Sequence, residues 1–378
     1  MPPRCLIPPP CRLATPSMNG KFEQRSRHRS RETNYEREVT DHPLSGETLM
    51  SYQLLIAVLA LVRPPGPLTV KGNTLIDSLG HVVRLKGVNV PSLEWSNEGD
   101  TEMQESISVA IGQWKANALR IPLSQDRWLG TAERQTDGGA AYRQVVDRVV
   151  NAIEARGSYA ILDLHWSNGG EPGKNLAQHW MPDDGSTKFW KDCAKRYSNR
   201  GAVLFDLYNE PHDVGWEIWQ NGGMVDELWN GKQLHYHSPG MAGLLAAVRS
   251  TGAKNVVFAS GLDWGYDLSG VLKGFELKGP NVAYASHIYP WKVEWDDRVG
   301  KVAKRFPVLI GEVGCEPDPK QEDPTTWAPK ILAWIDQNNV SWTAWCFHPS
   351  ASPRLLADWK YTPTTYWGAA VKRRLTSK

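Results

Sequence analysis

The 378-residue sequence has almost no net charge and few cysteines. Lys and Arg number 43 against 41 Asp and Glu, which leaves a formal charge of +2. Nucleic-acid-binding domains are typically strongly basic, so we expect no nucleic-acid partner. The five cysteines show no C-x-x-C spacing, which argues against a zinc site and a disulfide-rich scaffold. We expect Cys193, Cys315 and Cys346 to be small buried apolar residues; the alternative is a Cys315–Cys346 disulfide between neighbouring strands.

Long hydrophobic runs are missing as well. The apolar run at residues 54–62 is far shorter than the roughly 20 residues of a membrane-spanning helix, so we predict no integral membrane segment. The run has the length of a signal-peptide core, but no basic residue directly precedes it and no small-residue cleavage site follows. We predict that residues 1–66 form a disordered, basic and proline-rich leader, with Met50 as a hypothetical true start. A secreted or periplasmic location is the expectation.

Phenylalanine is scarce relative to tryptophan, with 7 Phe against 18 Trp. A buried indole N–H needs a hydrogen-bond acceptor, whereas Phe fills apolar space without that demand. A core alone therefore does not call for so many indoles. Flat aromatic platforms for a ligand such as a sugar are the alternative use, and both uses stay open at this point.

Short apolar runs alternate with helical segments from residue 68 onward. Residues 68–83 indicate two short strands around turn residues, a β-hairpin ahead of the main domain. The alternation after it predicts a parallel sheet, and eight units predict a closed (β/α)8 TIM barrel in an α/β domain at residues 67–378. An open doubly wound sheet is the alternative, but no G-x-G-x-x-G or Walker motif lies at a strand-to-helix turn. The predicted strands cover residues 84–90, 118–123, 159–164, 203–208, 256–260, 282–286, 308–311 and 342–345, and the helices cover 101–115, 140–156, 188–198, 240–251, 327–338 and 364–374.

Polar and aromatic residues stand at the ends of the predicted strands. In a barrel of this kind the carboxyl ends of the strands form the open rim that carries reactive groups. We therefore predict a functional site at this rim. Its residues are Arg120, His165, Trp166, Asn209, Glu210, Trp264, His287, Tyr289, Glu312 and Trp345.

Glu210 and Glu312 end the fourth and seventh predicted strands, so the barrel places both side chains on one rim. Two facing carboxylates suit glycoside hydrolysis, because one donates a proton to the leaving oxygen while the other stays ionised to attack or to activate water. Either glutamate alone could be structural, paired with Arg120 or with a helix end. The pair, flanked by Asn209 and His287, favours the catalytic interpretation.

Over residues 68–378 the chain resembles glycoside hydrolase family 5, the cellulase family of retaining β-glycosidases in the 4/7 barrel superfamily. The resemblance rests on short motifs, each weak alone, that occur in the family's order. They are Leu85-Lys-Gly-Val-Asn89, Leu-Arg-Ile-Pro at Arg120, Asp-Leu-His-Trp at His165, Tyr-Asn-Glu-Pro at Glu210, Ser-His-Ile-Tyr at His287, Ile-Gly-Glu-Val-Gly at Glu312, Thr-Ala-Trp at Trp345 and Asp358-Trp-Lys-Tyr-Thr-Pro363.

The resemblance implies that Glu210 is the general acid/base and that Glu312 is the nucleophile. The residues themselves support this division, because Arg120 and Tyr289 are placed to hold Glu312 ionised. Glu210 must instead keep a raised pKa. The remaining implied roles are a hydrogen bond from Asn209 to the sugar 2-OH, site-lining positions for His165 and His287, and an apolar floor formed by Trp345.

This chemistry needs no cofactor and no metal. His235-Tyr-His237 is the only His-x-His in the sequence, and it lies in a predicted Gly/Asn-rich loop after the fourth strand. No carboxylate arrangement around it indicates a ligand set. We therefore expect no metal site there.

Tryptophans in the predicted rim loops suit stacking on a sugar polymer, although packing is as plausible for any one of them. Together with the resemblance they favour a monomeric endo-β-1,4-glucanase that acts on a polysaccharide or oligosaccharide. The alternatives are a β-mannanase, a xyloglucanase, a β-glucosidase and a non-catalytic carbohydrate-binding barrel. Because no carbohydrate-binding module is evident, we expect crystalline cellulose to be a poor substrate. The loop tryptophans are Trp95, Trp166, Trp180, Trp190, Trp216, Trp219, Trp229, Trp264, Trp291 and Trp359.

Overall fold

The computed structural model describes residues 63–168 and 177–377. Most of the predicted leader, including the apolar run at 54–62, the hypothetical start at Met50 and both leader cysteines, lies outside the described residues. Within the described part of the chain, no helix combines the length and the apolar character that crossing a membrane requires.

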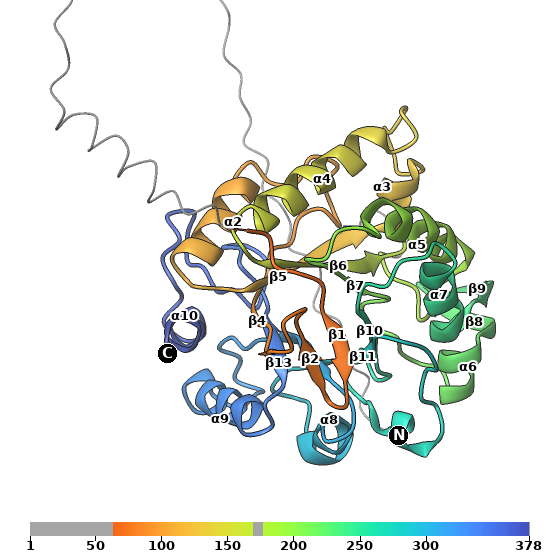
Figure 1. The fold of residues 1–378 in the computed structure, drawn as a ribbon. Coiled ribbons are helices and arrows are strands. Elements are labelled where there is room, and N and C mark those ends of the chain that lie inside the picture. Colours follow the sequence, from red (N-terminus) through yellow and green to blue (C-terminus); the bar gives the residue numbers. More distant parts are fainter. Residues whose placement is uncertain (1–62, 169–176, 378) are drawn as a thin grey trace, which may run out of the picture. The chain divides into compact units, whose positions relative to one another are not determined.

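Eight parallel strands close into a barrel, which confirms the predicted fold class (Figure 1). Neighbouring strands pair in parallel register, and the last strand pairs with the first to close the ring. The strands are buried along almost their whole length, as expected when helices cover the outside and side chains fill the inside. They are β4 (Lys86–Asn89), β5 (Ala118–Ser124), β6 (Tyr159–Trp166), β7 (Val203–Asp206), β10 (Val257–Ser260), β11 (Val282–Ile288), β12 (Val308–Val313) and β13 (Ser341–Ala344).

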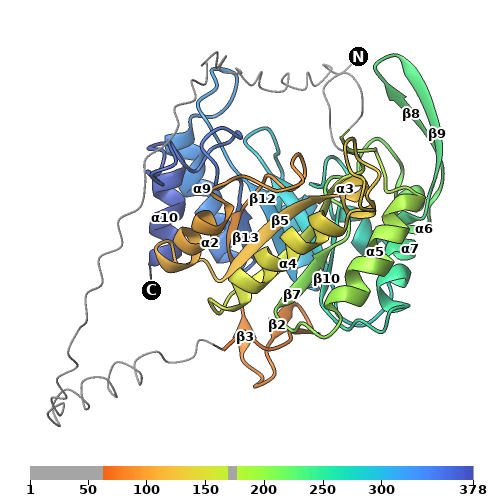
Figure 2. The ribbon, with the colours of Figure 1, turned by 90° about the horizontal axis from the view of Figure 1, so that it is seen from above.

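Helices return the chain from one strand to the next around the barrel (Figure 2). All six predicted helices are present: α2 (Met103–Gly112), α4 (Ala140–Glu154), α5 (Asp184–Tyr197), α7 (Gly240–Arg249), α9 (Pro324–Gln337) and α10 (Gly368–Thr376). Helix α5 begins four residues before its predicted start, because Asp183 and Ser186 form a capping box ahead of the apolar positions. Shorter segments that the sequence patterns did not predict are α3 (Gln125–Leu129), α6 (Trp216–Asn221), α8 (Lys301–Ala303), a 3-10 turn (Ser269–Lys273) and a π-helical turn (Asp296–Gly300).

An antiparallel sheet covers the end of the barrel where its strands begin. The predicted two-stranded hairpin has a third strand, because the Asp77 carboxylate accepts backbone hydrogen bonds from Leu79 and His81 and turns the chain back. Leu68 and Leu75 pack with the apolar residues at the strand starts and close this end. The opposite end is left for a site. The three strands are β1 (Thr69–Lys71), β2 (Thr74–Ile76) and β3 (Val82–Val83).

The segment after β7 contains a second hairpin where we predicted an irregular loop. Strands β8 (Gly223–Trp229) and β9 (Lys232–Ser238) pair antiparallel along their full length and extend beside α6 and α7 (Figure 2). Asn230 and Gly231 connect them with positive φ angles of 46° and 76°, the conformation that favours Asn-Gly in two-residue hairpin turns. The glycine and asparagine that suggested a loop therefore specify the turn.

Core packing is the role of many of the tryptophans. Within the described residues seven tryptophans are fully buried, and two of them, Trp190 and Trp219, belong to the predicted loop set. The indole of Trp190 donates to the backbone oxygen of Leu207 at 2.8 Å, and that of Trp219 donates to the backbone oxygen of Ser260 at 2.9 Å. These two residues are part of the core. The fully buried set is Trp114, Trp128, Trp190, Trp219, Trp327, Trp342 and Trp367.

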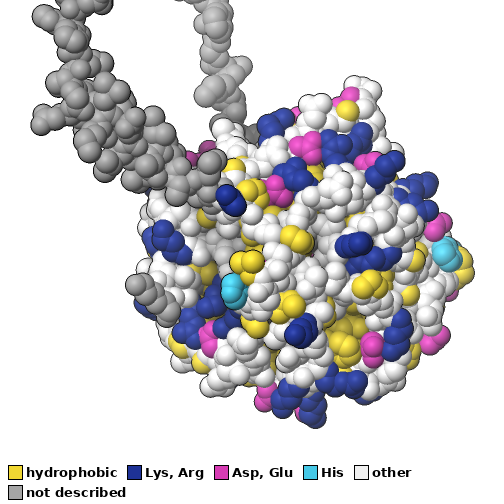
Figure 3. Space-filling model, in the orientation of Figure 1, with side chains coloured by type: hydrophobic (Ala, Val, Ile, Leu, Met, Phe, Trp, Pro, Cys, Tyr) yellow, Lys and Arg dark blue, Asp and Glu magenta, His cyan; other side chains and the backbone are white. Residues whose placement is uncertain are grey.

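Charges of both signs are interspersed on the molecular face in Figure 3. Ion pairs link some of them, as where the half-exposed Arg298 contacts Asp267 at 3.0 Å and Glu294 at 3.2 Å. Exposed pairs of this kind contribute little to stability, on the order of 0 to 1 kcal/mol.

Gly87 lies in β4, where the neighbouring strand leaves no space for a side chain. A Cβ atom on Gly87 would lie 1.7 Å from the backbone oxygen of Ala118. A barrel backbone cannot move aside, so we expect Gly87→Ala to lower the free energy of unfolding by about 3 kcal/mol or more. Gly112→Ala is the control, because nothing lies within 4 Å of that Cβ position and the residue ends α2. Denaturant unfolding should show the control unchanged or stabilised, and equal stability of both variants would contradict the close strand packing.

Candidate functional site

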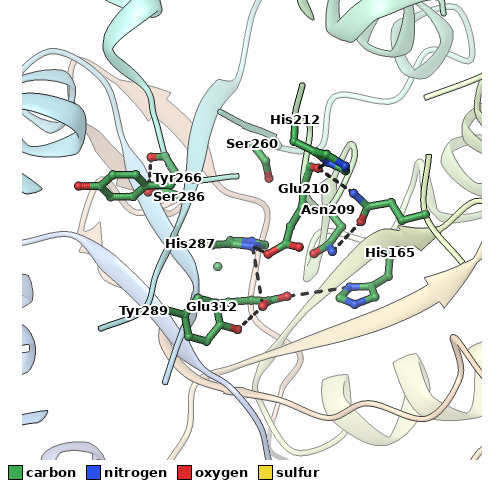
Figure 4. A network of polar contacts seen from close by, with 12 residues as sticks. His165, Asn209, Glu210, His212, Ser260, Tyr266, Ser286, His287, Tyr289 and Glu312 are labelled. Carbon is green, nitrogen blue, oxygen red and sulfur yellow. Dashed lines mark hydrogen bonds and ion pairs between the residues drawn. The ribbon is translucent and has the colours of Figure 1, made fainter. Parts of the chain in front are cut away.

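The predicted polar residues converge at the carboxyl ends of the barrel strands, where several of them point toward one another (Figure 4). Sites built on strands hold side chains more precisely than sites on loops. Arg120 lies in β5, His165 in β6, His287 in β11 and Glu312 in β12; Asn209 and Glu210 follow β7, Tyr289 follows β11 and Trp345 follows β13.

Glu312 is held at both carboxylate oxygens. Oε1 accepts a hydrogen bond from Arg120 Nη1 at 2.9 Å, and Oε2 accepts one from the Tyr289 hydroxyl at 2.5 Å. Burial raises the pKa of Tyr289 well above its ordinary value, so the hydroxyl remains a donor. Glu312 itself is 4% exposed. Glu312 is therefore fixed by a permanent cation on one oxygen and by a hydroxyl donor on the other.

Arg120 is a fully buried guanidinium with side-chain partners from several strands. Burial alone would lower its pKa, but Asp163, Asp206 and Glu312 raise the pKa above its ordinary value, so Arg120 stays charged. Its five partners are Asn89 Oδ1 at 3.0 Å, Asp163 Oδ2 at 3.1 Å, Asp206 Oδ2 at 2.9 Å, Asn209 Oδ1 at 2.9 Å and Glu312 Oε1 at 2.9 Å.

Sequence analysis missed Asp163 and Asp206 as part of this site. Burial raises the pKa of each to about 7, against the opposite influence of Arg120. Each aspartate interrupts an otherwise apolar buried strand, and charged residues are rarely fully buried unless paired. That interruption was the available signal. Asp163 also lies two residues before His165, on the same face of β6.

Glu210 has different surroundings from Glu312. Its Oε1 lies 3.0 Å from His287 Nδ1, and 21% of its side chain is exposed. Burial raises the pKa of Glu210, whereas burial lowers the pKa of His287 to about 3, which leaves that ring neutral near pH 7. One carboxylate oxygen of Glu210, one of Glu312 and a ring nitrogen of His287 lie within 4.8 Å of one another. Two carboxyl groups with unlike environments therefore share one small space.

Within residues 63–168 and 177–377, Glu210, His287 and Glu312 are the group whose spacing would suit a metal ion. Both Glu312 oxygens already accept hydrogen bonds there. The two histidines of the His-x-His motif lie on β9, where His235 pairs with Asp226 at 2.6 Å and His237 with Asp184 at 3.1 Å. Since each histidine binds a different exposed carboxylate, the motif does not gather a ligand set.

Asn209 lies between Arg120 and Gln178. Its Oδ1 accepts from Arg120 Nη2 at 2.9 Å, and its Nδ2 donates to Gln178 Oε1 at 2.8 Å. The backbone oxygen of Glu210 accepts from Gln178 Nε2 and from His212 Nδ1, both at 2.7 Å. Sequence analysis did not identify Gln178 or His212, because each acts through contacts between loops that no short motif records.

An aromatic surface lies beside the two glutamates. The rings of His165 and Trp345 stack in parallel, with centroids 5.4 Å apart and planes inclined by 6°. His165 Nδ1 lies 2.7 Å from Asp163 Oδ2, and burial lowers the pKa of His165 to about 4. Trp166 is tilted beside Trp95 at 6.4 Å. Predicted residues His165, Trp166 and Trp345 are thus brought together on one side of the site.

Two exposed indoles each rest on a ring that contacts one of the glutamates. Trp264 is 37% exposed and stacks on His212 with centroids 3.4 Å apart. Trp291 is 52% exposed and stacks on Tyr289 with centroids 5.0 Å apart and planes inclined by 4°. Flat exposed indole faces of this kind suit stacking on an apolar or amphipathic ligand face.

The three cysteines of the described part are buried and free. The alternative Cys315–Cys346 disulfide is therefore not formed. Burial raises the pKa of both of these thiols, and they pack as small apolar side chains.

A closed (β/α)8 barrel with two facing glutamates on its rim has the architecture of a barrel glycoside hydrolase. Residues 76–351 match the cellulase family, glycosyl hydrolase family 5, and this range includes all eight barrel strands. The chain belongs to glycoside hydrolase family 5.

An endoglucanase and a cellulase share limited sequence identity with the chain. Endoglucanase MaCel5A from Microbulbifer sp. (strain ALW1) is 24% identical over 294 residues, which are 74% of this chain and 51% of that protein. Cellulase CelDZ1 from Thermoanaerobacterium sp. is 22% identical over 346 residues, 88% of this chain and 80% of that protein. The chain thus spans about half the length of MaCel5A.

The β-glucanase SdGluc5_26A from Saccharophagus degradans has a similar solved structure, with a TM-score of 0.66 and 24% identity over 83% of this chain and 94% of that chain. The same β-glucanase has also been solved in complex with cellotetraose. The catalytic domain of the major endoglucanase from Xanthomonas campestris pv. campestris gives a TM-score of 0.63 at 20% identity, over 81% of this chain and 99% of that chain. These likenesses show a shared fold.

Removing Arg120 would leave several buried carboxylates without their cation. We expect Arg120→Leu to lower the free energy of unfolding by about 3 to 5 kcal/mol, because breaking a buried ion pair strands the remaining charges. Arg298→Leu is the control, since this half-exposed ion pair should cost less than about 1 kcal/mol. Urea unfolding of both variants makes the comparison. Similar losses in the two variants would mean that Arg120 is not the electrostatic centre of the rim.

Proposed function

We propose that this protein is a retaining endo-β-1,4-glucanase in which Glu312 is the nucleophile and Glu210 is the general acid/base. The observation that carries the proposal is the short separation of the two carboxylates, with oxygens within 4.8 Å. Retaining glycosidases place these groups about 5 to 5.5 Å apart, whereas inverting enzymes leave about 6.5 to 9.5 Å for a water molecule. The spacing therefore favours direct attack by a carboxylate.

The surroundings of the two glutamates support the division of roles. Glu312 accepts one hydrogen bond from Arg120 and one from Tyr289, so its position is fixed while each oxygen keeps a further lone pair, which suits a nucleophile. The pKa of Glu210 is raised by burial, which suits a group that must be protonated when the substrate binds. His287 is neutral and its Nδ1 can accept from protonated Glu210 or donate to the ionised form.

The proposed reaction has two displacement steps. In the first, a Glu312 oxygen bonds to the anomeric carbon, the glycosidic C–O bond breaks, and the leaving oxygen takes a proton from Glu210. In the second, a water molecule gives a proton to Glu210. The water oxygen bonds to the anomeric carbon, and the bond from that carbon to Glu312 breaks and releases the carboxylate. Two inversions at one carbon retain the β configuration.

Neighbouring residues supply the proposed substrate contacts. Asn209 presents an amide beside Glu210 for the 2-OH of the sugar, a hydrogen bond that strengthens as the oxocarbenium-like transition state forms. Trp345 offers an apolar ring beneath the cleavage point, with His165 stacked against it. Trp166 and Trp95 contact each other on the same side of the site as His165. Trp264 stacks on His212, which adjoins Glu210.

The glucan specificity draws on the relatives. The two relatives described above are an endoglucanase and a cellulase, and the similar β-glucanase has been solved in complex with cellotetraose. Partly exposed indoles around the glutamates suit a polymer that occupies several sugar positions. Because a polymeric glucan cannot cross a membrane, a secreted or periplasmic location is part of the proposal. A β-mannanase, a xyloglucanase and a β-glucosidase use the same mechanism and differ in substrate.

Removal of the nucleophile should change both the rate and the stereochemistry. We expect Glu312→Ala to abolish turnover of 2,4-dinitrophenyl β-cellobioside, because no carboxylate remains to attack the anomeric carbon. Azide that enters the vacated space attacks once from the same face, so the rescued product should be the α-glycosyl azide. Proton NMR of the product gives the anomeric configuration.

The matched variant is Glu210→Ala on the same substrate. Its dinitrophenolate leaving group needs no proton, so the glycosyl-enzyme should still form, and azide should then release the β-glycosyl azide after two inversions. Identical products from the two variants would contradict the separate roles. A β-azide from Glu312→Ala would mean that Glu210 is the nucleophile and Glu312 the acid/base.

Product profiles should identify the polymer. We expect the full chain to reduce the viscosity of carboxymethyl cellulose well before reducing ends accumulate, and to act much less on β-mannan, because an endo enzyme cuts internal bonds. Glucomannan and xyloglucan complete the panel, and the isosteric Glu312→Gln variant is the control for background activity. A preference for mannan or xyloglucan would change the substrate and keep the mechanism, whereas inactivity on all four would favour the binding-only barrel.

A further inference from the structure

Gln178 contacts both Asn209 and Glu210, which lie shortly after the end of β7. Its Oε1 accepts a hydrogen bond from Asn209 Nδ2 at 2.8 Å, and its Nε2 donates to the backbone oxygen of Glu210 at 2.7 Å. One side chain therefore binds both the amide next to the glutamates and the peptide group that carries Glu210. Gln178 contacts neither of the two carboxylates in the described structure, so any influence on them is indirect.

Hydrogen bonds run in series from Arg120 through Asn209 and Gln178 to the Glu210 carbonyl, and the groups at the two ends determine the direction of each bond. A guanidinium only donates, so Oδ1 is the Asn209 atom that faces Arg120 Nη2. A backbone carbonyl only accepts, so Nε2 is the Gln178 atom that faces Glu210. Gln178 Oε1 must then face Asn209 Nδ2, and the Asn209 amide has a single orientation. One Nδ2 hydrogen binds Gln178, and no contact among the described residues uses the second.

The β8–β9 hairpin holds the residues next to Gln178. Glu227 on β8 is 1% exposed, and its Oε2 accepts from His179 Nδ1 at 2.9 Å and from the Trp180 backbone N–H at 3.1 Å. On β9, the Tyr236 hydroxyl accepts from the Met181 N–H at 3.0 Å and donates to the Met181 carbonyl at 3.2 Å. The hairpin thus binds three consecutive residues that adjoin Gln178.

A side chain on the barrel itself binds the same segment. The hydroxyl of Tyr208, which follows β7, donates to the backbone oxygen of His179 at 2.8 Å. The Trp180 carbonyl accepts the backbone N–H of His212, whose ring in turn donates to the Glu210 carbonyl. The segment at residues 178–181 is therefore fixed between the hairpin and the end of β7.

We propose that Gln178 is a positioning residue: held in place by the β8–β9 hairpin, it orients the Asn209 amide so that the free Nδ2 hydrogen meets the 2-OH of the substrate. The inference rests on the proposed function, because it assigns a role within that reaction. A hydrogen bond that strengthens in the transition state depends on its geometry, and small misplacements of such groups lower rates substantially. The hairpin thereby acts on the reaction through Gln178 and Asn209.

A substrate that lacks the 2-OH separates this role from a general structural one. Gln178→Met removes both hydrogen-bonding groups and keeps the length of the side chain. We expect it to lower kcat/KM for 2,4-dinitrophenyl β-cellobioside by about 10- to 100-fold. For the analogue that lacks the 2-OH on the sugar at the cleavage point, the loss should be less than about threefold, because the contact is already absent. The dinitrophenolate leaving group removes any contribution from proton donation by Glu210.

Gln135→Met is the matched control. Gln135 is also half-buried, donates to the Arg127 carbonyl at 2.8 Å and accepts from the Ala132 N–H at 3.3 Å. This variant should leave both rates unchanged. Glu227→Gln tests the hairpin, and it stands in for Gln178→Met if that variant does not fold. It should show a smaller loss with the same dependence on the 2-OH.

Equal losses on the two substrates, or no loss on either, would overturn the proposal. A crystal structure of Gln178→Met is a second test that does not depend on activity. The Asn209 amide should rotate or shift in that structure, and an unchanged amide would also overturn the proposal. If the unmodified protein cleaves neither glycoside, the proposed function fails, and the orientation of Asn209 in that crystal structure still decides whether Gln178 positions it.

Discussion

The rim of this barrel depends on one buried cation. Arg120 contacts three carboxylates, Asp163, Asp206 and Glu312, which come from three different strands. Without a positive charge among them, these strand ends would repel one another in a region that water does not screen. The guanidinium also has a rigid planar shape with donors in fixed directions, so each partner it binds is located relative to the others. Charge balance and geometry at the rim therefore have the same source.

The two glutamates of the site have different neighbours. Glu312 lies on the cation side, with both oxygens bound by donors that do not titrate near neutral pH. Glu210 lies farther from that cation and beside a neutral imidazole, and burial raises its pKa. Two carboxyl groups that share a space of a few ångströms thus have different neighbours.

Much of the architecture could be predicted from the sequence, because parallel strands buried on both faces appear as apolar runs and their polar last residues stand out. The same logic located Glu210 and Glu312. It failed for Gln178, which contacts Asn209 and Glu210 from a separate loop. It also failed for the β8–β9 hairpin, because Asn and Gly there indicated irregular structure when they marked a tight turn. For Trp190 and Trp219, the sequence could not show that nearby backbone carbonyls accept their indole hydrogens.

The stacked rings at the rim connect the outer surface with the chemistry. Trp264 rests on His212, which binds the Glu210 peptide, and Trp291 rests on Tyr289, which binds the Glu312 carboxylate. Each exposed indole is thus one aromatic ring away from a contact with Glu210 or Glu312. In the proposed reaction, contacts made far from the scissile bond can therefore help to align that bond. Longer saccharides should then show a higher kcat, and their ground-state binding should not become tighter.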